Sequence, residues 1–193
     1  MELNKNFLVR GPRIYLRSLR VDDAEGNYHG WINDPEVTRY LVSRIGRQSV
    51  ADIEAYIRAS IAKPDEVMLA ACRNGSDEHI GNLKLEHINE THKSGWMSIV
   101  MGRQSEQGRG IGTEAIALTT LVAFRHLDLR RIDAGCFAEN KGAVRAFEKC
   151  GYLREGFTRE QFLADGKAWD AVWLGLLAHD PPLWRDIINE NEE

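Results

Sequence analysis

The sequence has little of what marks several large classes of protein. Only three of its 193 residues are cysteines, and Cys72, Cys136 and Cys150 form no CxxC pair or Cys/His cluster. An odd number of isolated cysteines argues against a disulfide framework or a zinc site and predicts reduced, mostly buried thiols. The longest apolar run, residues 171–178, is far shorter than the roughly 20 residues that a membrane-spanning helix needs, so no membrane partner is expected.

The beginning of the sequence also lacks a targeting signal. Residues 1–13 mix charged with apolar side chains and contain no apolar stretch of signal-peptide length. Together with the cysteine usage, this predicts a cytoplasmic protein. The 25 Lys and Arg residues against 29 Asp and Glu residues give a formal net charge of −4. Because nucleic acids are bound by basic surfaces, this balance disfavours nucleic acid as a partner.

Composition and length predict one ordinary globular domain. The chain is 43% hydrophobic and 28% charged, which is typical of globular proteins. Its 193 residues lie in the single-domain range, and we find no internal repeats, low-complexity tracts or linkers. The expected domain therefore fills residues 1–193, with a core at about 13–178 and a short tail at 179–193.

Hydrophobic periodicity and turn signals predict a mixture of strands and helices. Strands are expected at 13–19, 66–72, 79–88, 95–101, 131–137, 155–163 and 168–177, and helices at 21–32, 49–63, 110–126, 140–150 and after Pro182. Ser49 with Asp52 fits a capping pattern, and Gly151 fits the left-handed residue that stops a helix. Three consecutive strands with hairpin-length connections predict an antiparallel meander, and the strand–helix–strand passage that follows predicts a parallel crossover. The predicted fold class is therefore α/β to α+β, a mixed, mostly antiparallel twisted sheet of about seven strands with helices on both faces.

A glycine-rich segment precedes the helix predicted at 110–126. It reads Gln107-Gly108-Arg109-Gly110-Ile111-Gly112 and leads into Thr113. Alternating glycines permit positive φ angles and a close approach of ligand to backbone, while the first-turn amides of the helix and its dipole attract an anion. Arg109 adds a positive side chain, so a pyrophosphate group fits this segment.

Three other interpretations of these glycines stay open at this point. A P-loop requires GK[ST] after a four-residue gap, but no Lys follows the glycines. A nicotinamide-binding dinucleotide fold requires GxGxxG tight against its strand, whereas here residues 103–107 intervene and Thr113 takes the place of the last glycine. The third interpretation is a plain glycine-rich helix start that binds no ligand.

Several motifs in this order resemble the GNAT superfamily of N-acyltransferases. Gln107-x-x-Gly110-x-Gly112 is similar to that family's acyl-CoA pyrophosphate loop, Q/R-x-x-G-x-G/A. The later family motif, N-x-x-[AS] followed by GF or GY, resembles Asn140-x-x-Ala143 and Phe147-x-x-Cys150-Gly151-Tyr152.

Two further segments resemble one branch of that superfamily, which contains ribosomal-protein-alanine and amino-sugar acetyltransferases. They are residues 31–37 (WINDPEV) and Gly156 with Trp169-Asp170. The resemblance covers residues 13–177, nearly the whole chain.

The resemblance implies a site for acetyl-CoA, which serves as a co-substrate, and no metal. In the family the sheet opens between the strands predicted here at 95–101 and 131–137, and the pantetheine arm lies in the opening like a missing strand. The residues that would hold acetyl-CoA are Val100, Met101, Gly102, Gln107, Gly108, Arg109, Gly110, Ile111, Gly112, Thr113 and Asn140. The acceptor, once a neutral amine, would attack the thioester directly.

Two positions depart from the family pattern. Many relatives carry a Tyr or a Ser near the leaving sulfur as general acid, and the corresponding positions here hold Phe147 and Ala143. Neither side chain has a proton to give, so we assign the general acid to neither residue.

The candidate bases are Glu86 and His87, at the end of the strand predicted at 79–88. The two-residue period of a strand places Glu86 on one face with Asn82 and Lys84, and His87 on the other with the leucines. A carboxylate or imidazole there could take the proton of an ammonium acceptor. The alternatives are a solvated glutamate and a packed histidine.

The acceptor pocket is expected at residues 31–47, next to the N-terminal helices. Its aromatic and basic side chains suit an anionic acceptor such as a nucleotide sugar, with a solvated charge cluster as the alternative. They are Trp31, Arg39, Tyr40, Arg44 and Arg47. Asp170 is expected either to position substrate or to tie down a loop.

The predicted function is transfer of an acetyl group from acetyl-CoA to a primary amine, with a small amine or an amino sugar as acceptor. One alternative is acetylation of a protein N-terminus. The other is a non-catalytic acyl-CoA-binding module, which the residues at positions 143 and 147 favour. Many members of the family form homodimers, but no segment of this sequence specifies an interface.

Overall fold

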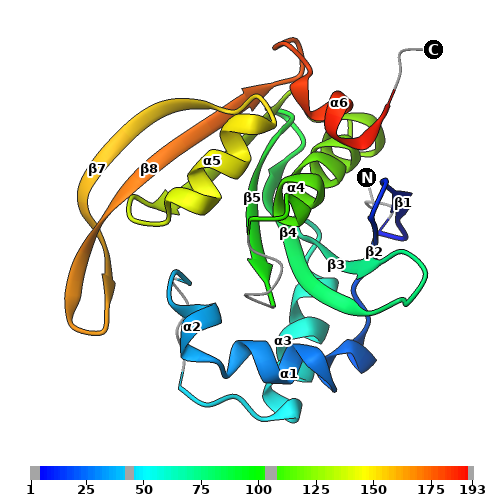
Figure 1. Ribbon diagram of the computed structural model, residues 1–193, viewed down its shortest axis with the longest axis vertical. Helices are drawn as coiled ribbons and strands as arrows, with labels where there is room; N and C mark the ends of the chain where they lie inside the picture. The colour runs from blue at the N-terminus through cyan, green and yellow to red at the C-terminus, as the bar shows by residue number, and fades with distance from the viewer. Residues whose placement is uncertain (1–4, 42–45, 103–107, 191–193) are drawn as a thin grey trace.

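A single twisted sheet forms the centre of the molecule (Figure 1). The computed structural model describes residues 5–41, 46–102 and 108–190. Within these residues, eight strands lie in the order β1-β2-β3-β4-β5-β6-β8-β7. The strands are β1 (Leu8–Arg10), β2 (Ile14–Ser18), β3 (Val67–Arg73), β4 (His79–Asn89), β5 (Ser94–Met101), β6 (Arg131–Phe137), β7 (Leu153–Ala164) and β8 (Lys167–Leu177).

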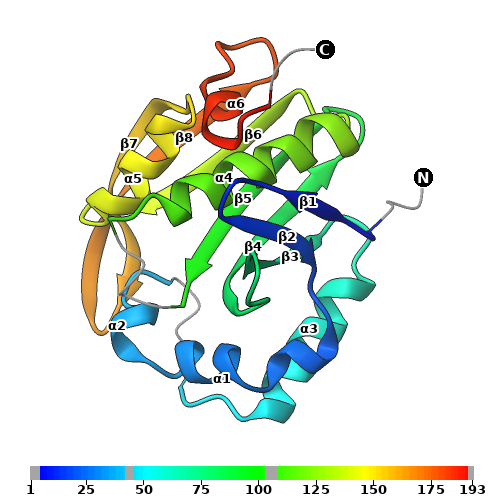
Figure 2. The ribbon, with the colours of Figure 1, turned by 45° about the vertical axis from the view of Figure 1, so that its right-hand side comes forward.

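Helices cover both faces of this sheet (Figure 2). A 3-10 turn, η1 (Val21–Ala24), leads into α1 (Asn27–Ile32), α2 (Pro35–Thr38) and α3 (Val50–Ala62). The later helices are α4 (Ile111–Leu121) with its π-helical extension η3 (Val122–His126), α5 (Lys141–Lys149) and α6 (Leu183–Ile188). The side chains of α1 and α3 pack on one face, and those of α4, α5 and α6 pack on the other.

The alternation of side chains along β2 and β3 produces these two layers. Ile14, Leu16 and Leu69 point into the core under α4, whereas Tyr15 and Met68 point into the smaller core under α1 and α3. Because successive strand residues face opposite sides of a sheet, a strand buried on both faces carries apolar side chains throughout.

The sheet parts in the middle. β5 and β6 run parallel and pair over three positions only, Ser94–Trp96 against Arg131–Asp133. Beyond Trp96, β5 continues to pair with β4 as far as Met101, while β6 pairs with β8 along its whole length. Alternate backbone groups of residues 97–101 therefore face an opening instead of a neighbouring strand, and the parting expected from the family resemblance is confirmed.

The predicted fold class is confirmed, with eight strands where about seven were expected. The additional strand is β1, whose three residues are too few for a periodic signal. The predicted caps are present: Ser49 and Asp52 form a capping box at α3, and Gly151 takes a φ of +95° after α5.

The prediction of one continuous helix over 21–32 is wrong. Gly26 takes a φ of +70°, outside the helical region, and separates η1 from α1. The turn expected around Asn33-Asp34-Pro35 contains the short helix α2, because Asp34 accepts a hydrogen bond from the Glu36 N–H and Pro35 occupies the first helical position.

The three cysteines are free thiols and buried, as predicted. Burial raises the pKa of Cys136 and of Cys150 to about 12. No described helix has both the length and the apolar character that crossing a bilayer requires.

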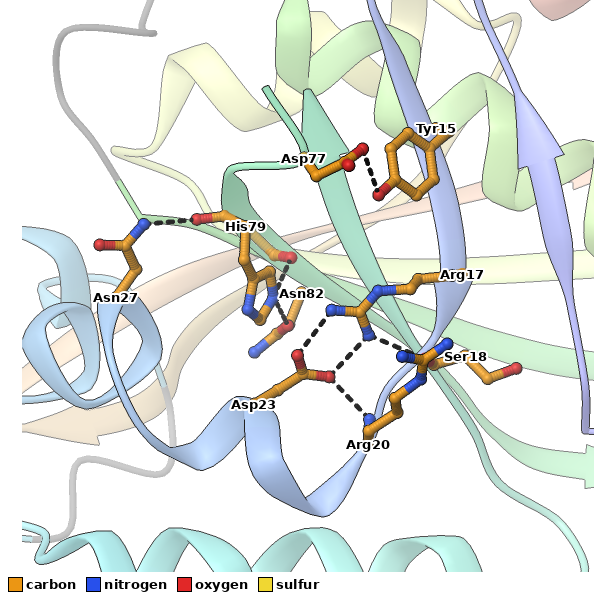
Figure 3. A network of polar contacts seen from close by, with 10 residues as sticks. Tyr15, Arg17, Ser18, Arg20, Asp23, Asn27, Asp77, His79 and Asn82 are labelled. Atoms are coloured by element: carbon orange, nitrogen blue, oxygen red, sulfur yellow. Dashed lines mark hydrogen bonds and ion pairs between the residues drawn. The ribbon is translucent and has the colours of Figure 1, made fainter. Parts of the chain in front are cut away.

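An ion pair joins η1 to the sheet (Figure 3). Arg17 on β2 donates to both carboxylate oxygens of Asp23, at 2.7 and 2.6 Å, and the Arg20 N–H donates to the same carboxylate at 2.7 Å. Burial alone would raise the pKa of Asp23, but these hydrogen bonds outweigh burial and hold the pKa below its ordinary value.

This pair makes stability depend on pH. A carboxyl group whose pKa is lowered by folding stabilises the fold above its unfolded pKa, about 3.9, and loses that contribution as the pH falls through the lower folded value. We expect Asp23→Asn to cost about 2 kcal/mol in the free energy of unfolding at pH 7, because Arg17 keeps its charge and loses its partner. Urea unfolding at pH 7 and pH 3 measures this; the difference from the native chain should narrow at pH 3. The matched control is Asp22→Asn, a change at the exposed neighbouring residue, and an equal loss in that variant would contradict the role of the pair.

Candidate active site

The parting of β5 and β6 opens into a cavity of about 1270 Å³. One side of the cavity is formed by β4 and β5, and the other by β6, β8 and the start of α5. Residues of α1, α2 and α3 close it from one face of the sheet. The cavity therefore lies where the resemblance places the thioester and its acceptor.

A row of polar side chains on β4 lines the cavity: Asn82, Lys84 and Glu86. The intervening Leu83 and Leu85 belong to the core under α4, as the two-residue period requires. Lys84 Nζ lies 2.5 Å from Glu86 Oε2 and 3.9 Å from Glu66 Oε2. Burial alone would lower the pKa of Lys84, but the hydrogen bond to Glu86 and the charges of Glu86 and Glu66 together outweigh burial, and the pKa is raised. Lys84 is therefore a cation, paired with the candidate base.

A partly buried network next to the cavity orients the first residue of this row (Figure 3). His79 Nε2 lies 2.7 Å from Asn82 Oδ1 and 3.1 Å from the Gly81 carbonyl oxygen. Both partners are acceptors, so Nε2 carries the proton, and burial lowers the pKa of His79, which favours the neutral ring.

The amide of Asn82 consequently directs its nitrogen away from His79. Asn82 is 3% exposed, and Nδ2 has no acceptor in hydrogen-bond geometry among the described residues. A polar neighbour of this amide is Tyr28, which also lines the cavity. Burial raises the pKa of Tyr28 to about 12, and the Asn82 amide opposes that rise. Asn82 Nδ2 is thus a hydrogen-bond donor held ready in the cavity wall.

The glycine-rich segment has the geometry expected of an anion site. Gly108 and Gly110 take φ angles of +79° and +78°, which only glycine adopts without strain. The first helical hydrogen bond of α4 runs from the Glu114 N–H to the Gly110 carbonyl at 3.0 Å. The amides of Ile111, Gly112 and Thr113 therefore make no bond within the helix. Gln107 lies outside the described residues.

The end of β5 supplies only part of what the resemblance implies. Val100 lines the cavity, and Met101 is the last residue of the strand, opposite Gly81. Gly102 donates its N–H to the Ile80 carbonyl at 2.8 Å, so this amide is not available to a ligand. A Cβ at Gly102 would lie 2.1 Å from the Trp31 ring, and the residue must be glycine.

The motif at the start of α5 lies on the opposite wall. Asn140 lines the cavity and caps the helix, its Oδ1 accepting from the Ala143 N–H at 3.2 Å. Ala143 and Phe147 also line the cavity. The nearby phenol is Tyr152, which packs edge-on against Phe147 at 5.0 Å and is raised in pKa by complete burial. Its hydroxyl lies 3.0 Å from Thr120 Oγ1 and not in the cavity, so it does not replace the missing general acid.

His87 does not lie where the sequence placed it. The prediction that it shares the apolar face of β4 is wrong: His87 is exposed, has a φ of +53°, and lies at a break in the β4–β5 register between Glu86 and Asn89. The irregularity turns its side chain out of the strand pattern. Of the two candidate bases, Glu86 alone lines the cavity.

The residues predicted to bind the acceptor are dispersed. Tyr40 lines the cavity and packs against Phe137 at 5.8 Å, with Arg39 over its ring at 5.3 Å. Trp31 is instead buried and packs edge-on against His79 at 4.8 Å. Arg44 lies outside the described residues.

Of the two roles expected for Asp170, its contacts fit that of tying down a loop. Its Oδ1 accepts a hydrogen bond from the Glu160 N–H at 2.9 Å, at the register shift between β7 and β8. It does not line the cavity, so it ties down the bulge of the hairpin.

Aromatic side chains that the sequence did not single out complete the wall. Tyr28 of α1 and Tyr56 of α3 face the β4 row, and Trp173 of β8 packs edge-on against Trp96 at 5.6 Å. Tyr56 falls at helical spacing with core residues, and only its 45% exposure distinguishes it from them. No local signal in the sequence could have separated these residues from the core.

Comparison with known proteins gives one family throughout. Residues 13–153 match the acetyltransferase (GNAT) domain. The probable N-acetyltransferase YjcK of Bacillus subtilis is 28% identical over 180 residues, which cover 90% of this chain and 98% of that protein. The spermidine N(1)-acetyltransferase of Vibrio cholerae is 32% identical over 98 residues, which cover 51% of this chain and 56% of that protein.

Solved structures show the same fold. A spermidine N-acetyltransferase from Vibrio cholerae, in complex with CoA and spermine, superimposes with a TM-score of 0.79 at 24% identity, covering 86% of this chain and 96% of that one. A GNAT-family acetyltransferase from Bacillus anthracis superimposes with a TM-score of 0.76 at 21% identity, covering 89% of this chain and 98% of that one.

The glycine segment can be tested with a matched pair of glycines. Gly108 and Gly75 both have φ near +80° and open space where a Cβ would lie, but Gly75 lies in the β3–β4 turn. We expect Gly108→Val and Gly75→Val to lose similar stability, about 1–2 kcal/mol, from left-handed strain. Only Gly108→Val should weaken binding of CoA, measured by isothermal titration calorimetry. Equal affinities in the two variants would remove Gly108 from the site.

Proposed function

The chain belongs to the GNAT superfamily and is an N-acetyltransferase, and we propose that it transfers the acetyl group of acetyl-CoA to the primary amine of a small molecule. One observation carries the proposal. The cavity at the parting of β5 and β6 brings together a strand edge, the start of α5 and a carboxylate, Glu86, that can face an amine.

The residues around the opening fit acetyl-CoA. Free backbone groups along residues 97–101 can pair with the amides of a pantetheine arm, as an added strand would. The amides of Ile111, Gly112 and Thr113 and the dipole of α4 can bind the pyrophosphate. Acetyl-CoA, once bound, supplies an activated thioester.

Glu86 is the residue that can receive the proton of the acceptor. Lys84 binds it through Oε2, which leaves Oε1 to accept a hydrogen bond from an ammonium group. Taking that proton, directly or through one water, makes the amine a nucleophile. Asn82 Nδ2, oriented by the contact of Oδ1 with His79, is a donor that can hydrogen-bond a carbonyl or hydroxyl oxygen in the same cavity.

The lining of the cavity supports a small, polar acceptor. Charged side chains of both signs line it, namely Arg47, Asp52, Lys84, Glu86 and Asp165. Aromatic rings such as Tyr28 and Tyr56 provide surfaces on which a sugar or an alkyl chain can pack. This mixture fits an amino sugar or another amine with several polar groups. The spermidine enzyme of Vibrio cholerae makes a polyamine the first competing acceptor to examine.

An acceptor screen tests the proposal. CoA release from acetyl-CoA should be detected with at least one small amine in a panel of amino sugars, polyamines, amino acids and N-terminal peptides. A thermal shift should accompany acetyl-CoA alone, since ligand at 100 times its Kd adds about 2.7 kcal/mol to the free energy of unfolding. Turnover confined to peptides would favour the N-terminal alternative, and binding without any turnover would contradict the enzymatic role of the cavity.

The role of Glu86 predicts a specific kinetic change. Glu86→Gln should lower kcat about 10²- to 10⁴-fold and leave the KM for acetyl-CoA unchanged, because the loss is that of a proton acceptor. The rate of the variant should rise with pH toward the native rate, because the fraction of acceptor already present as free amine increases.

The control for this change is Glu155→Gln, which removes another ion-paired glutamate, the partner of Arg131, outside the cavity. It should leave kcat unaltered. A pH–rate profile of Glu86→Gln parallel to that of the native chain would exclude Glu86 as the base.

A further inference from the structure

We propose that Arg13 is a positioning residue for the glycine-rich segment: it holds the carbonyls of Arg109 and Gly110. The amides of the residues that follow, Gly110 and Ile111, then face the pyrophosphate of acetyl-CoA. The inference rests on the proposed function, because it concerns the same bound ligand. It assigns a role to a side chain that lies outside the glycine motif, about a hundred residues earlier in the sequence.

The contacts of Arg13 with the loop are made by both ends of its fork. Nη1 donates to the Arg109 carbonyl oxygen, and Nη2 donates to the Gly110 carbonyl oxygen at 3.1 Å. A flat guanidinium group with two parallel donors is suited to binding two neighbouring acceptors at once. A lysine ammonium would not reach both carbonyls with the same geometry.

Peptide geometry converts these contacts into an orientation. In a trans peptide the C=O of one residue and the N–H of the next point in opposite directions, and no described peptide bond is cis. When Arg13 holds the carbonyls of residues 109 and 110, the N–H groups of Gly110 and Ile111 must point away from it. Both amides therefore join those of the first turn of α4 on the side open to a ligand.

A buried carboxylate holds Arg13 in turn. Glu114, in the first turn of α4, is fully buried and accepts from Arg13 Nε at 2.6 Å, from the Arg13 N–H at 2.8 Å and from the Ile14 N–H at 3.1 Å. Its position near the helix N-terminus is also favourable to a negative charge. The start of β2, the start of α4 and the loop are thus joined through one ion pair.

The conformation of Gly110 agrees with this arrangement. A Cβ at this position would lie 3.3 Å from Arg13 Nη2, and the φ of +78° already disfavours other residues. Gly110 is therefore required both by its own backbone and by the close approach of the guanidinium group.

Three variants separate positioning from direct attraction of the phosphates. Arg13→Met removes the fork, Arg13→Lys keeps the charge without the fork, and Glu114→Gln loosens Arg13 from a position that no ligand can touch. The matched control is Arg131→Met, which breaks an ion pair with Asp133 and Glu155 at the start of β6. Circular dichroism and thermal melts show which variants are folded.

We expect all three variants to raise the Kd for CoA and the KM for acetyl-CoA about tenfold or more. The kcat should be nearly unchanged, because the variants lose a contact that supports ligand binding and keep the groups that carry out the reaction. The double variant Arg13→Met/Glu114→Gln should be no weaker than the worse single variant, since the two residues act through one contact. With S-acetylpantetheine, which lacks the pyrophosphate, the native chain and the variants should have equal kcat/KM.

Native affinity in Arg13→Lys would overturn the proposal in favour of simple charge attraction. An equal loss with S-acetylpantetheine, or with Arg131→Met, would overturn it in favour of a general structural effect. If the native chain itself does not bind CoA, the proposed function fails; if it binds CoA and all Arg13 variants bind equally well, only the present inference fails.

Discussion

The short contact between β5 and β6 is the constraint on which the site depends. Three paired positions, ending at Trp96 and Asp133, are enough to join the two halves of the sheet. Beyond these positions the strands diverge, so one edge of β5 has no neighbouring strand while its other edge stays paired with β4. In most proteins an exposed edge inside a sheet would be a liability, and here it is the surface on which a cofactor can lie.

Around this opening, the groups proposed to bind acetyl-CoA and those proposed to act on the acceptor lie in different parts of the structure. The glycine segment and the start of α4 lie beyond the end of β5 and present backbone amides, held in place by the ion pair between Arg13 and the buried Glu114. The polar row of β4 lies under the helices α1 and α3 and consists of side chains, Asn82, Lys84 and Glu86. In the proposed function, backbone amides would bind a ligand group that is the same for every acceptor, whereas side chains would adapt the cavity to the acceptor.

The fold class and the local features of this fold could be predicted from the sequence, whereas register shifts and the packing of individual side chains could not. The capping box at Ser49 and the left-handed Gly151 depend on neighbouring residues only, and both are confirmed. The alternation along β4 placed Glu86 with Asn82 and Lys84 correctly. The same alternation gave the wrong face for the next residue, His87, because the pairing of β4 with β5 shifts its register there. That pairing cannot be deduced from the residues of β4 alone.

The residues that line the cavity near the acceptor were the hardest to identify from the sequence. Trp31 and Tyr28 lie on the same short helix, and their aromatic character gave no indication that Tyr28 lines the cavity while Trp31 packs on Gly102. Such a distinction depends on the angle between α1 and the sheet. Tyr56 shows the same limit, since its helical spacing is that of a core residue.

The burial of Cys136 has a consequence for an enzyme that handles a thioester. This thiol lines the same cavity as Glu86 and Asn140, and a thiolate there would exchange with the acyl group and trap the enzyme in an acylated form. Burial raises the pKa of this thiol to about 12, so it stays protonated at neutral pH. The apolar surroundings that make Cys136 unreactive therefore also protect the acetyl group on its way to the amine.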